Sequence, residues 1–175
     1  MTQQDYEFWA ASAAVRAQDT HAGIFDVVDD HAGSQEAGFN RGFSTSFRLK
    51  PGTSTWFHVP IPTPALIAGQ KLVLTRLSLL WFTEDDLQLS WATAHIGGAR
   101  RMELSTRATP IEGVVDTDLE MPHGLKVTTL RKDFPLDQPV PVDMGVQLCL
   151  HAEASPDGNG GTFRFYGAGA SFSAA

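Results

Sequence analysis

The stretch FSTSFRLKPGTSTWFHVPIPTPAL, residues 43–66, contains two β-like segments separated by a tight turn. Along residues 43–50, phenylalanine, threonine and leucine alternate with serine, arginine and lysine, and this period of two indicates a strand with one buried face. Pro51 presets φ and Gly52 accepts positive φ, so the two residues predict a turn. Residues 55–61, TWFHVPI, predict the next strand. The stretch therefore favours an antiparallel β fold.

The same pattern continues along the rest of the chain. Residues 70–82 are hydrophobic on both faces, which is typical of a central or covered strand. The connector SPDGNGG has the chemistry of a hairpin loop, so we expect residues 142–154 and 161–174 to form a closing pair. Further strands are expected at residues 21–28, 87–96 and 125–130. About eight to ten short strands predict a β-sandwich of jelly-roll or Greek-key type.

Residues 1–20 are expected to form an N-terminal arm, and residues 21–175 a single β-sandwich domain. Aromatic and alanine residues recur at spacings of three and four along residues 5–18, so this part fits either a short helix or an extended arm. Tyr6, Phe8 and Trp9 lie on an arm with little core of its own. We therefore expect them to contact another copy of the chain in a homo-oligomer.

Composition limits the partners and the compartment. The chain has 13 Lys and Arg against 20 Asp and Glu, a formal net charge of −7, which argues against nucleic acid as the main partner. A single cysteine, Cys149, rules out an internal disulfide and fits a reducing compartment. The sequence starts without a basic and apolar leader, and no apolar run approaches about 18 residues. These features predict a cytoplasmic protein without a membrane partner.

Part of the opening stretch resembles a family of small, uncharacterised β-rich microbial proteins. Those proteins carry a segment of the form FRxKPGTxxWFHxPIPTP, followed by two long strands and a glycine-rich closing hairpin. Detailed agreement here is confined to residues 38–66, while the strand order extends the resemblance to about residues 21–173. The resemblance implies a compact β-sandwich and carries no catalytic role. The arm and the longer loop at residues 105–124 depart from the family pattern.

Motifs for catalysis or cofactor binding are scarce. The sequence has no phosphate-binding loop, HExxH, CxxC or GxSxG motif, so we expect no cofactor, no metal and no catalytic residues. Six histidines are present, but the nearest two, His21 and His31, are ten residues apart. By strand parity, His58 and His95 are expected to point into the sandwich and His151 out of it. Ser78, Ser90 and Cys149 are candidate nucleophiles by residue type alone.

Two functions follow from the aromatic and proline residues. Trp81 and Trp91 are expected in the core, whereas one of Trp56 and Phe57 is expected to be partly exposed or in an interface. The segment with Pro60, Pro62 and Pro64 fits a rigid edge connector, or alternatively an association surface or ligand lip. The first function is a non-enzymatic binding or self-assembling module that uses the arm and these prolines. The alternative is a small-molecule or carbohydrate-active protein, and the candidate ligand-binding residues are Trp56, His58, Trp91 and His95.

Overall fold

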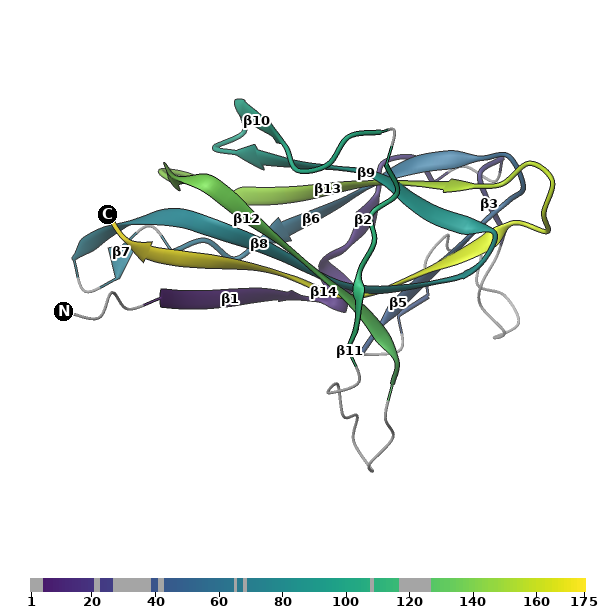
Figure 1. Cartoon of the computed structure of the whole chain (residues 1–175), viewed down its shortest axis with the longest axis horizontal. Coiled ribbons are helices and arrows are strands. Elements are labelled where there is room, and N and C mark those ends of the chain that lie inside the picture. The colour runs from purple at the N-terminus through teal and green to yellow at the C-terminus, as the bar shows by residue number, and fades with distance from the viewer. Residues whose placement is uncertain are drawn as a thin grey trace.

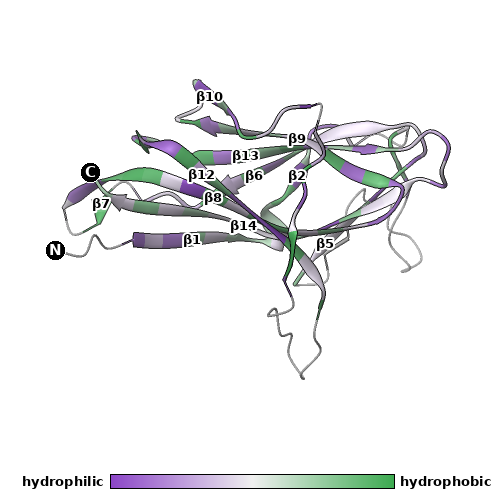
Figure 2. Cartoon of the chain, viewed as in Figure 1, coloured by the Kyte–Doolittle hydropathy of each residue, from purple (hydrophilic) through white to green (hydrophobic). Residues whose placement is uncertain are grey.

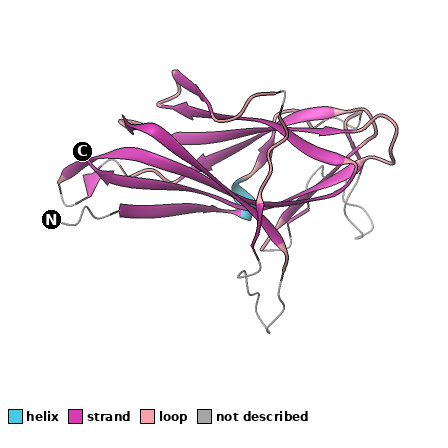
Figure 3. Cartoon of the chain, viewed as in Figure 1, coloured by secondary structure: helices cyan, strands magenta, loops and turns pink. Residues whose placement is uncertain are grey.

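The computed structural model describes residues 5–20, 23–26, 39–40, 43–64, 66–67, 69–107, 109–116 and 127–175. Figure 3 shows that this part of the chain consists mainly of strands joined by loops, with one short 3-10 turn, Ser12–Ala14. No helix in the described ranges has the length and apolar character needed to cross a membrane. The strands form two sheets that face each other, as Figure 1 shows.

The larger, nine-stranded sheet has the order β11-β12-β8-β14-β5-β3, and β1, β4 and β7 pair beside this path. Its strands are β1 (Asp5–Ala11), β3 (Phe25–Asp26), β4 (Phe39–Asn40), β5 (Thr45–Leu49), β7 (Leu66–Ile67), β8 (Gln70–Asp85), β11 (Val114–Asp116), β12 (Thr129–Pro141) and β14 (Gly161–Ala174). The five-stranded sheet has the order β10-β9-β13-β6-β2. Its strands are β2 (Arg16–Ala17), β6 (Ser54–Ile61), β9 (Leu87–Ile96), β10 (Arg100–Glu103) and β13 (Val146–Ala154).

The connections give the sandwich its jelly-roll topology. Strands β5, β8, β12 and β14 lie in one sheet and β6, β9, β10 and β13 in the other, and the chain crosses between the sheets at nearly every step. All pairings in both sheets are antiparallel. Two facing sets of four strands, one set from each sheet, form a jelly roll when they are connected in this way. The predicted antiparallel β-sandwich is therefore confirmed, and β8 is the central strand that its hydrophobic faces predicted.

The core lies between the two sheets because alternate residues of each strand point inward. Phe57 of β6 is completely buried, and its ring centroid lies 4.7 Å from that of Phe47 and 4.8 Å from that of Phe163. Trp81 of β8 is also buried, as predicted. Figure 2 shows bands of high and low hydropathy succeeding one another along the strands, which is the pattern of one buried and one exposed face.

The N-terminal arm is extended rather than helical. Strand β1 pairs antiparallel with residues 167–173 of β14, and β5 pairs with residues 161–165 of the same strand. After β1 the chain turns through Ser12–Ala14 and pairs β2 with β6, so the arm contributes to both sheets. Of the two alternatives left open by the sequence, the extended one holds. The helix-like spacing of aromatic and alanine residues was misleading because Tyr6, Phe8 and Ala10 share an inward face at period two.

The predicted closing hairpin is wrong in one respect. Residues 146–154 form β13 and residues 161–174 form β14, but the two strands lie in opposite sheets. The connector SPDGNGG therefore crosses from one layer of the sandwich to the other. It is held there because the Ser155 backbone N–H donates to the carbonyl of Asp86 at 2.9 Å, and the Gly52 N–H donates to the Ser155 carbonyl at 3.2 Å.

The proline segment lies at a sheet edge, as its missing backbone donors predicted. Pro60 lies opposite Gln147 of β13, whereas the described residues of β2 pair with β6 only at Phe57 and His58. The Thr63 hydroxyl then accepts a hydrogen bond from the Val146 N–H at 3.1 Å, which ties the segment to the start of β13. Of the strand expected at residues 21–28, only residues 25–26 are described as strand, and of that expected at 125–130 only 129–130, at the start of β12.

Candidate ligand-binding face

The outer face of the five-stranded sheet collects the four predicted ligand-binding residues. Trp56 of β6, His151 of β13 and Trp91 of β9 are direct neighbours in register. One step along the strands, His58 lies beside Cys149 and Thr93, and one step further His95 lies beside Gln147. We call this surface the aromatic face and define it by Trp56, His58, Trp91, His95 and His151.

The expectation that Trp91 belongs to the core is wrong, and a β-bulge is the reason. His151 of β13 pairs with Trp91, but Ala152 pairs with Leu89, so Ser90 is an extra residue in β9. Leu87 and Leu89 point inward before the bulge, and Trp91 and His95 point outward after it. The four side chains therefore do not share one face, although their odd numbering suggested that they do.

The inward orientation expected for His58 and His95 is also wrong. In β6 the buried positions are Phe57, Val59 and Ile61, which leaves Trp56 and His58 on the outer face. His151 points outward as predicted, but it is only 8% exposed, and the Trp56 ring packs against it. His21, His31 and His123 lie outside the described residues. Among the residues described, no three His, Cys, Asp or Glu side chains are placed to hold a metal ion.

The two tryptophans are in contact with each other, and Trp56 also contacts His151. Their ring centroids are 5.0 Å apart with an interplanar angle of 58°, and the Trp56 ring lies 5.1 Å from the His151 ring. Ser90 Oγ and His151 Nδ1 share a hydrogen bond of 2.8 Å beneath them. Burial lowers the pKa of His151, so the imidazole is neutral at pH 7. The result is an uncharged, partly exposed aromatic surface on a sheet that is otherwise polar outside.

Strand β10 holds Trp91 from two sides. The indole N–H of Trp91 donates to Glu103 Oε2 at 2.5 Å, and the Arg101 guanidinium lies 4.9 Å from the centre of the Trp91 ring. Arg101 Nη2 is in turn 3.0 Å from Glu103 Oε1. Cation–π contact and a charge-assisted hydrogen bond together fix the orientation of the indole. Sequence reasoning missed Arg101 and Glu103, because only the pairing of β9 with β10 brings them beside Trp91.

A polar network surrounds His58 on the same face. His58 Nδ1 lies 3.2 Å from Cys149 Sγ and 3.0 Å from Gln147 Nε2, and its Nε2 lies 3.2 Å from Gln18 Oε1. Burial, and secondarily the proximity of His95, lowers the pKa of His58. Burial raises the pKa of the Cys149 thiol, so it stays protonated at neutral pH. These amide, imidazole and thiol groups can donate hydrogen bonds to a hydroxyl-rich ligand and accept hydrogen bonds from it.

Ser90, His151 and Glu153 bring together the residue types of a hydrolytic triad, but their geometry does not. In a triad the two imidazole nitrogens contact different partners, the nucleophile on one side and the carboxylate on the other. Here Ser90 Oγ is 2.8 Å from His151 Nδ1, and Glu153 Oε2 is 4.0 Å from the same nitrogen. Ser90 is moreover only 2% exposed. The arrangement supports a packed hydrogen bond beneath the tryptophans rather than a nucleophile.

A cleft of about 670 Å³ opens next to the aromatic face. Its lining includes Ser54, Gln88 and Glu153, which are outward residues of β6, β9 and β13 one step beyond the tryptophans. Gln88 Nε2 donates to Glu153 Oε1 at 2.7 Å. Asp85 and Asp86 also line the cleft. The aromatic face and the cleft therefore form one continuous surface.

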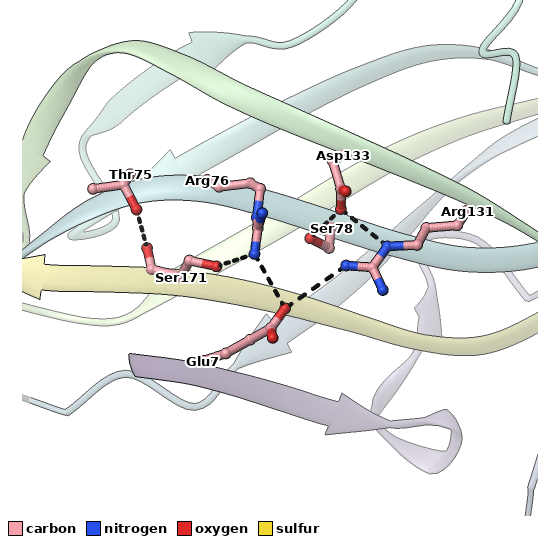
Figure 4. Close-up of polar contacts among 7 residues, drawn as sticks. All are labelled: Glu7, Thr75, Arg76, Ser78, Arg131, Asp133 and Ser171. Carbon is pink, nitrogen blue, oxygen red and sulfur yellow. Dashed lines mark hydrogen bonds and ion pairs between the residues drawn. The ribbon is translucent and has the colours of Figure 1, made fainter. Parts of the chain in front are cut away.

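The outer face of the nine-stranded sheet carries a different polar cluster, shown in Figure 4. Glu7 of β1 lies 3.6 Å from Arg76 of β8 and 3.9 Å from Arg131 of β12. Asp133 accepts from Ser78 at 2.6 Å and from Arg131 at 3.3 Å. Because Glu7 joins two strands that β1 does not pair with, this cluster fastens the N-terminal strand to the sheet.

The predicted contact residues of the arm lie on both sides of β1. Phe8 points inward and packs edge-on against Phe172 with ring centroids 5.9 Å apart. Tyr6 also packs against the core, whereas Trp9 lies on the outer face over Gly169, with the Arg131 guanidinium 5.7 Å from its ring. Pro60 and Pro62 are exposed and Pro64 is half-buried. Association of copies through these residues stays a prediction.

No protein-family model and no curated protein sequence matches the chain. Among solved structures, a family 29 carbohydrate-binding module has a TM-score of 0.45 and 8% identity, over 95% of this chain and 89% of that one. TmCBM61 in complex with β-1,4-galactotriose has a TM-score of 0.38 and 9% identity, over 93% of this chain and 86% of that one. Because both TM-scores are below 0.5, the ligands of these proteins supply no argument about this chain.

Proposed function

We propose that the chain is a non-enzymatic binding module that holds a carbohydrate on its aromatic face. The observation that carries the proposal is the pair of partly exposed tryptophans, 5.0 Å apart, on a sheet face lined by hydrogen-bonding side chains. The π-face of an indole is negatively polarised and attracts the positively polarised C–H groups of a sugar ring. Binding sites commonly combine such aromatic surface with a few fixed polar groups.

The groups around the tryptophans suit the hydroxyls of a sugar. Gln18, Gln147 and His58 lie on one side of Trp56, and Gln88 and Glu153 lie on the other. These side chains supply both donors and acceptors, so hydroxyl groups that leave water on binding find new partners. Arg101 and Glu103 hold Trp91 in place before a ligand binds. The entropic cost of ordering the site on binding is therefore smaller.

Titration of the protein with carbohydrates tests the proposal. Ligands are first found on a glycan array, and their affinities are then measured by calorimetry for the native chain and the Trp56→Ala and Trp91→Ala variants. Loss of one stacking ring is expected to weaken binding about tenfold, or about 1.4 kcal/mol. Trp9→Ala is the matched control, because Trp9 is a partly exposed tryptophan on the other sheet. Absence of any carbohydrate ligand, or an equal loss in the control, would refute the proposal.

A further inference from the structure

The two tryptophans of the aromatic face are not coplanar. Their rings meet at 58°, and the Arg101 guanidinium occupies space above the Trp91 ring. The ordered surface of a packed polysaccharide presents its sugar rings in one plane, and two rings at this angle cannot both lie flat against it. They can contact two sides of one free chain, whose successive sugars are able to rotate about their linkages.

The surface beyond the tryptophans gives such a chain a direction. Along β6, the step from Trp56 to Ser54 reaches the cleft, and Gly52 also lines it. The two-residue step of extended chain from Trp56 to Ser54 spans about 7 Å at about 3.4 Å per residue, which is longer than one sugar ring. Gln88 and Glu153 belong to the row next to the tryptophans and also line the cleft. No ridge of main chain therefore separates the tryptophans from the cleft.

The charges along this path oppose an anionic ligand. Glu153, Asp85 and Asp86 line the cleft, and Glu103 lies beside Trp91. Two of the nearby guanidinium groups are engaged: Arg101 contacts Glu103 and the Trp91 ring, and Arg48 lies 3.1 Å from Asp85, while Arg107 adds a positive charge close to His151. A carboxylate or sulfate on the ligand would therefore face these carboxylates, whereas a sugar hydroxyl can donate a hydrogen bond to them.

From the ring geometry, the continuous cleft and the charges, we infer that the ligand is a single uncharged oligosaccharide chain. It lies along the strands, with one end on Trp56 and Trp91 and the other in the cleft at Ser54, Gln88 and Glu153. The inference rests on the proposed carbohydrate binding and adds to it the charge, the single-chain form and the direction of the ligand. The cleft residues bind the sugars that follow the one stacked on the tryptophans.

Calorimetry with matched oligosaccharides tests the inference. The probes are uncharged gluco-, manno- and galacto-oligosaccharides of two to six sugars, together with oligogalacturonates and chitosan oligomers of the same lengths. We expect affinity to rise at least fivefold from the disaccharide to the tetrasaccharide of the preferred uncharged series. It should change less than twofold between about 0.02 M and 0.5 M salt, because screening acts on charged ligands.

Variants separate the cleft from the tryptophans. Gln88→Ala is expected to remove most of the gain between disaccharide and tetrasaccharide, so that it lowers tetrasaccharide affinity by a larger factor than disaccharide affinity. Gln88 is exposed, so the substitution is compatible with folding. A Glu153→Gln variant is measured in the same way, and Glu112→Gln is its control. Glu112 is an exposed carboxylate on the side of the larger sheet, so Glu112→Gln should leave all affinities unchanged.

The outcomes distinguish this inference from the proposed function. Binding that depends on Trp56 but prefers oligogalacturonate or chitosan, falls steeply with salt, or gains nothing from chain length would overturn the inference and leave carbohydrate binding intact. An equal loss of disaccharide and tetrasaccharide affinity in Gln88→Ala would overturn the proposed direction. If none of the probes and no other carbohydrate binds, the proposed function itself fails.

Discussion

Substitution of Gly169 by alanine is expected to destabilise the protein through one contact, that with Trp9. A Cβ atom at Gly169 would lie 2.7 Å from Cε2 and 2.8 Å from Cδ2 of the Trp9 indole. Carbon atoms in good contact are about 3.5–4.0 Å apart, so the rigid ring must move away by about 1 Å. It is restrained by the seven-residue pairing of β1 with β14 and by Arg131 beside the ring.

The expected magnitude follows from two opposing terms. Overpacking of this kind costs about 1–3 kcal/mol. Replacing glycine by alanine in extended backbone restricts the unfolded chain and contributes about 0.4–1 kcal/mol of stability. The net loss expected for Gly169→Ala is about 1–2 kcal/mol, measured by urea unfolding as a lower midpoint at unchanged slope. Gly145→Ala is the control: no atom lies within 4 Å of its Cβ position and its φ is not positive, so no loss is expected.

A double-mutant cycle with Trp9→Ala isolates the contact. Without the indole, Gly169→Ala should be neutral or stabilising, which gives a coupling free energy of about 1–3 kcal/mol between the two positions. If Gly169→Ala costs as much in the Trp9→Ala background as in the native chain, the glycine is required for another reason and the argument from ring contact is wrong.

Three further predictions concern the core, the histidines and the thiol. Phe57→Ala should lower the free energy of unfolding by about 3–5 kcal/mol in urea titrations, because the ring is fully buried against Phe163. Burial lowers the pKa values of His58 and His151 below the unfolded value of about 6.5, so the unfolded chain takes up protons first and stability should fall from pH 7.5 to pH 5.5. His151→Gln should weaken the dependence of stability on pH, and an unchanged slope in this variant would contradict the role of His151. Cys149, 2% exposed and with its thiol pKa raised by burial, should react with a disulfide reagent at pH 8 only as fast as the protein unfolds; fast labelling of the native chain would contradict this.

The period-two pattern of the sequence was sufficient to predict the fold class and the central position of β8. It failed where a strand contains a bulge. In β8 the inward residues are Leu72 and Leu74 before the irregularity near Arg76, and Leu77 and Leu79 after it. Counting in twos through that position assigns half of the strand to the wrong face. A bulge is set by pairing with another strand, so a single sequence gives no signal for it.

The glycines of YGAGAS, residues 166–171, show a second limit. Alternation of glycine with alanine identifies a strand with small residues on both faces, and the structure confirms the strand. Ala168 and Ala170 are buried in the core, while Gly167 and Gly169 leave room for the Trp9 indole on the outer face. The partner of these glycines lies some 160 residues away in sequence. Only the pairing of β1 with β14 reveals why the side chains must be absent.

The aromatic face could be predicted as a set of residues but not as a surface. In β6 the apolar positions Phe57, Val59 and Ile61 alternate with Trp56 and His58, so parity places His58 outside once Phe57 is inside. That step was available from the sequence. The next was not: His151 and Trp91 reach the same row only because β13 pairs with β6 and β9 in a particular register. Register between strands so distant in sequence is fixed by packing of the two sheets, which is why the residues that hold Trp91 and line the cleft emerge only from the structure.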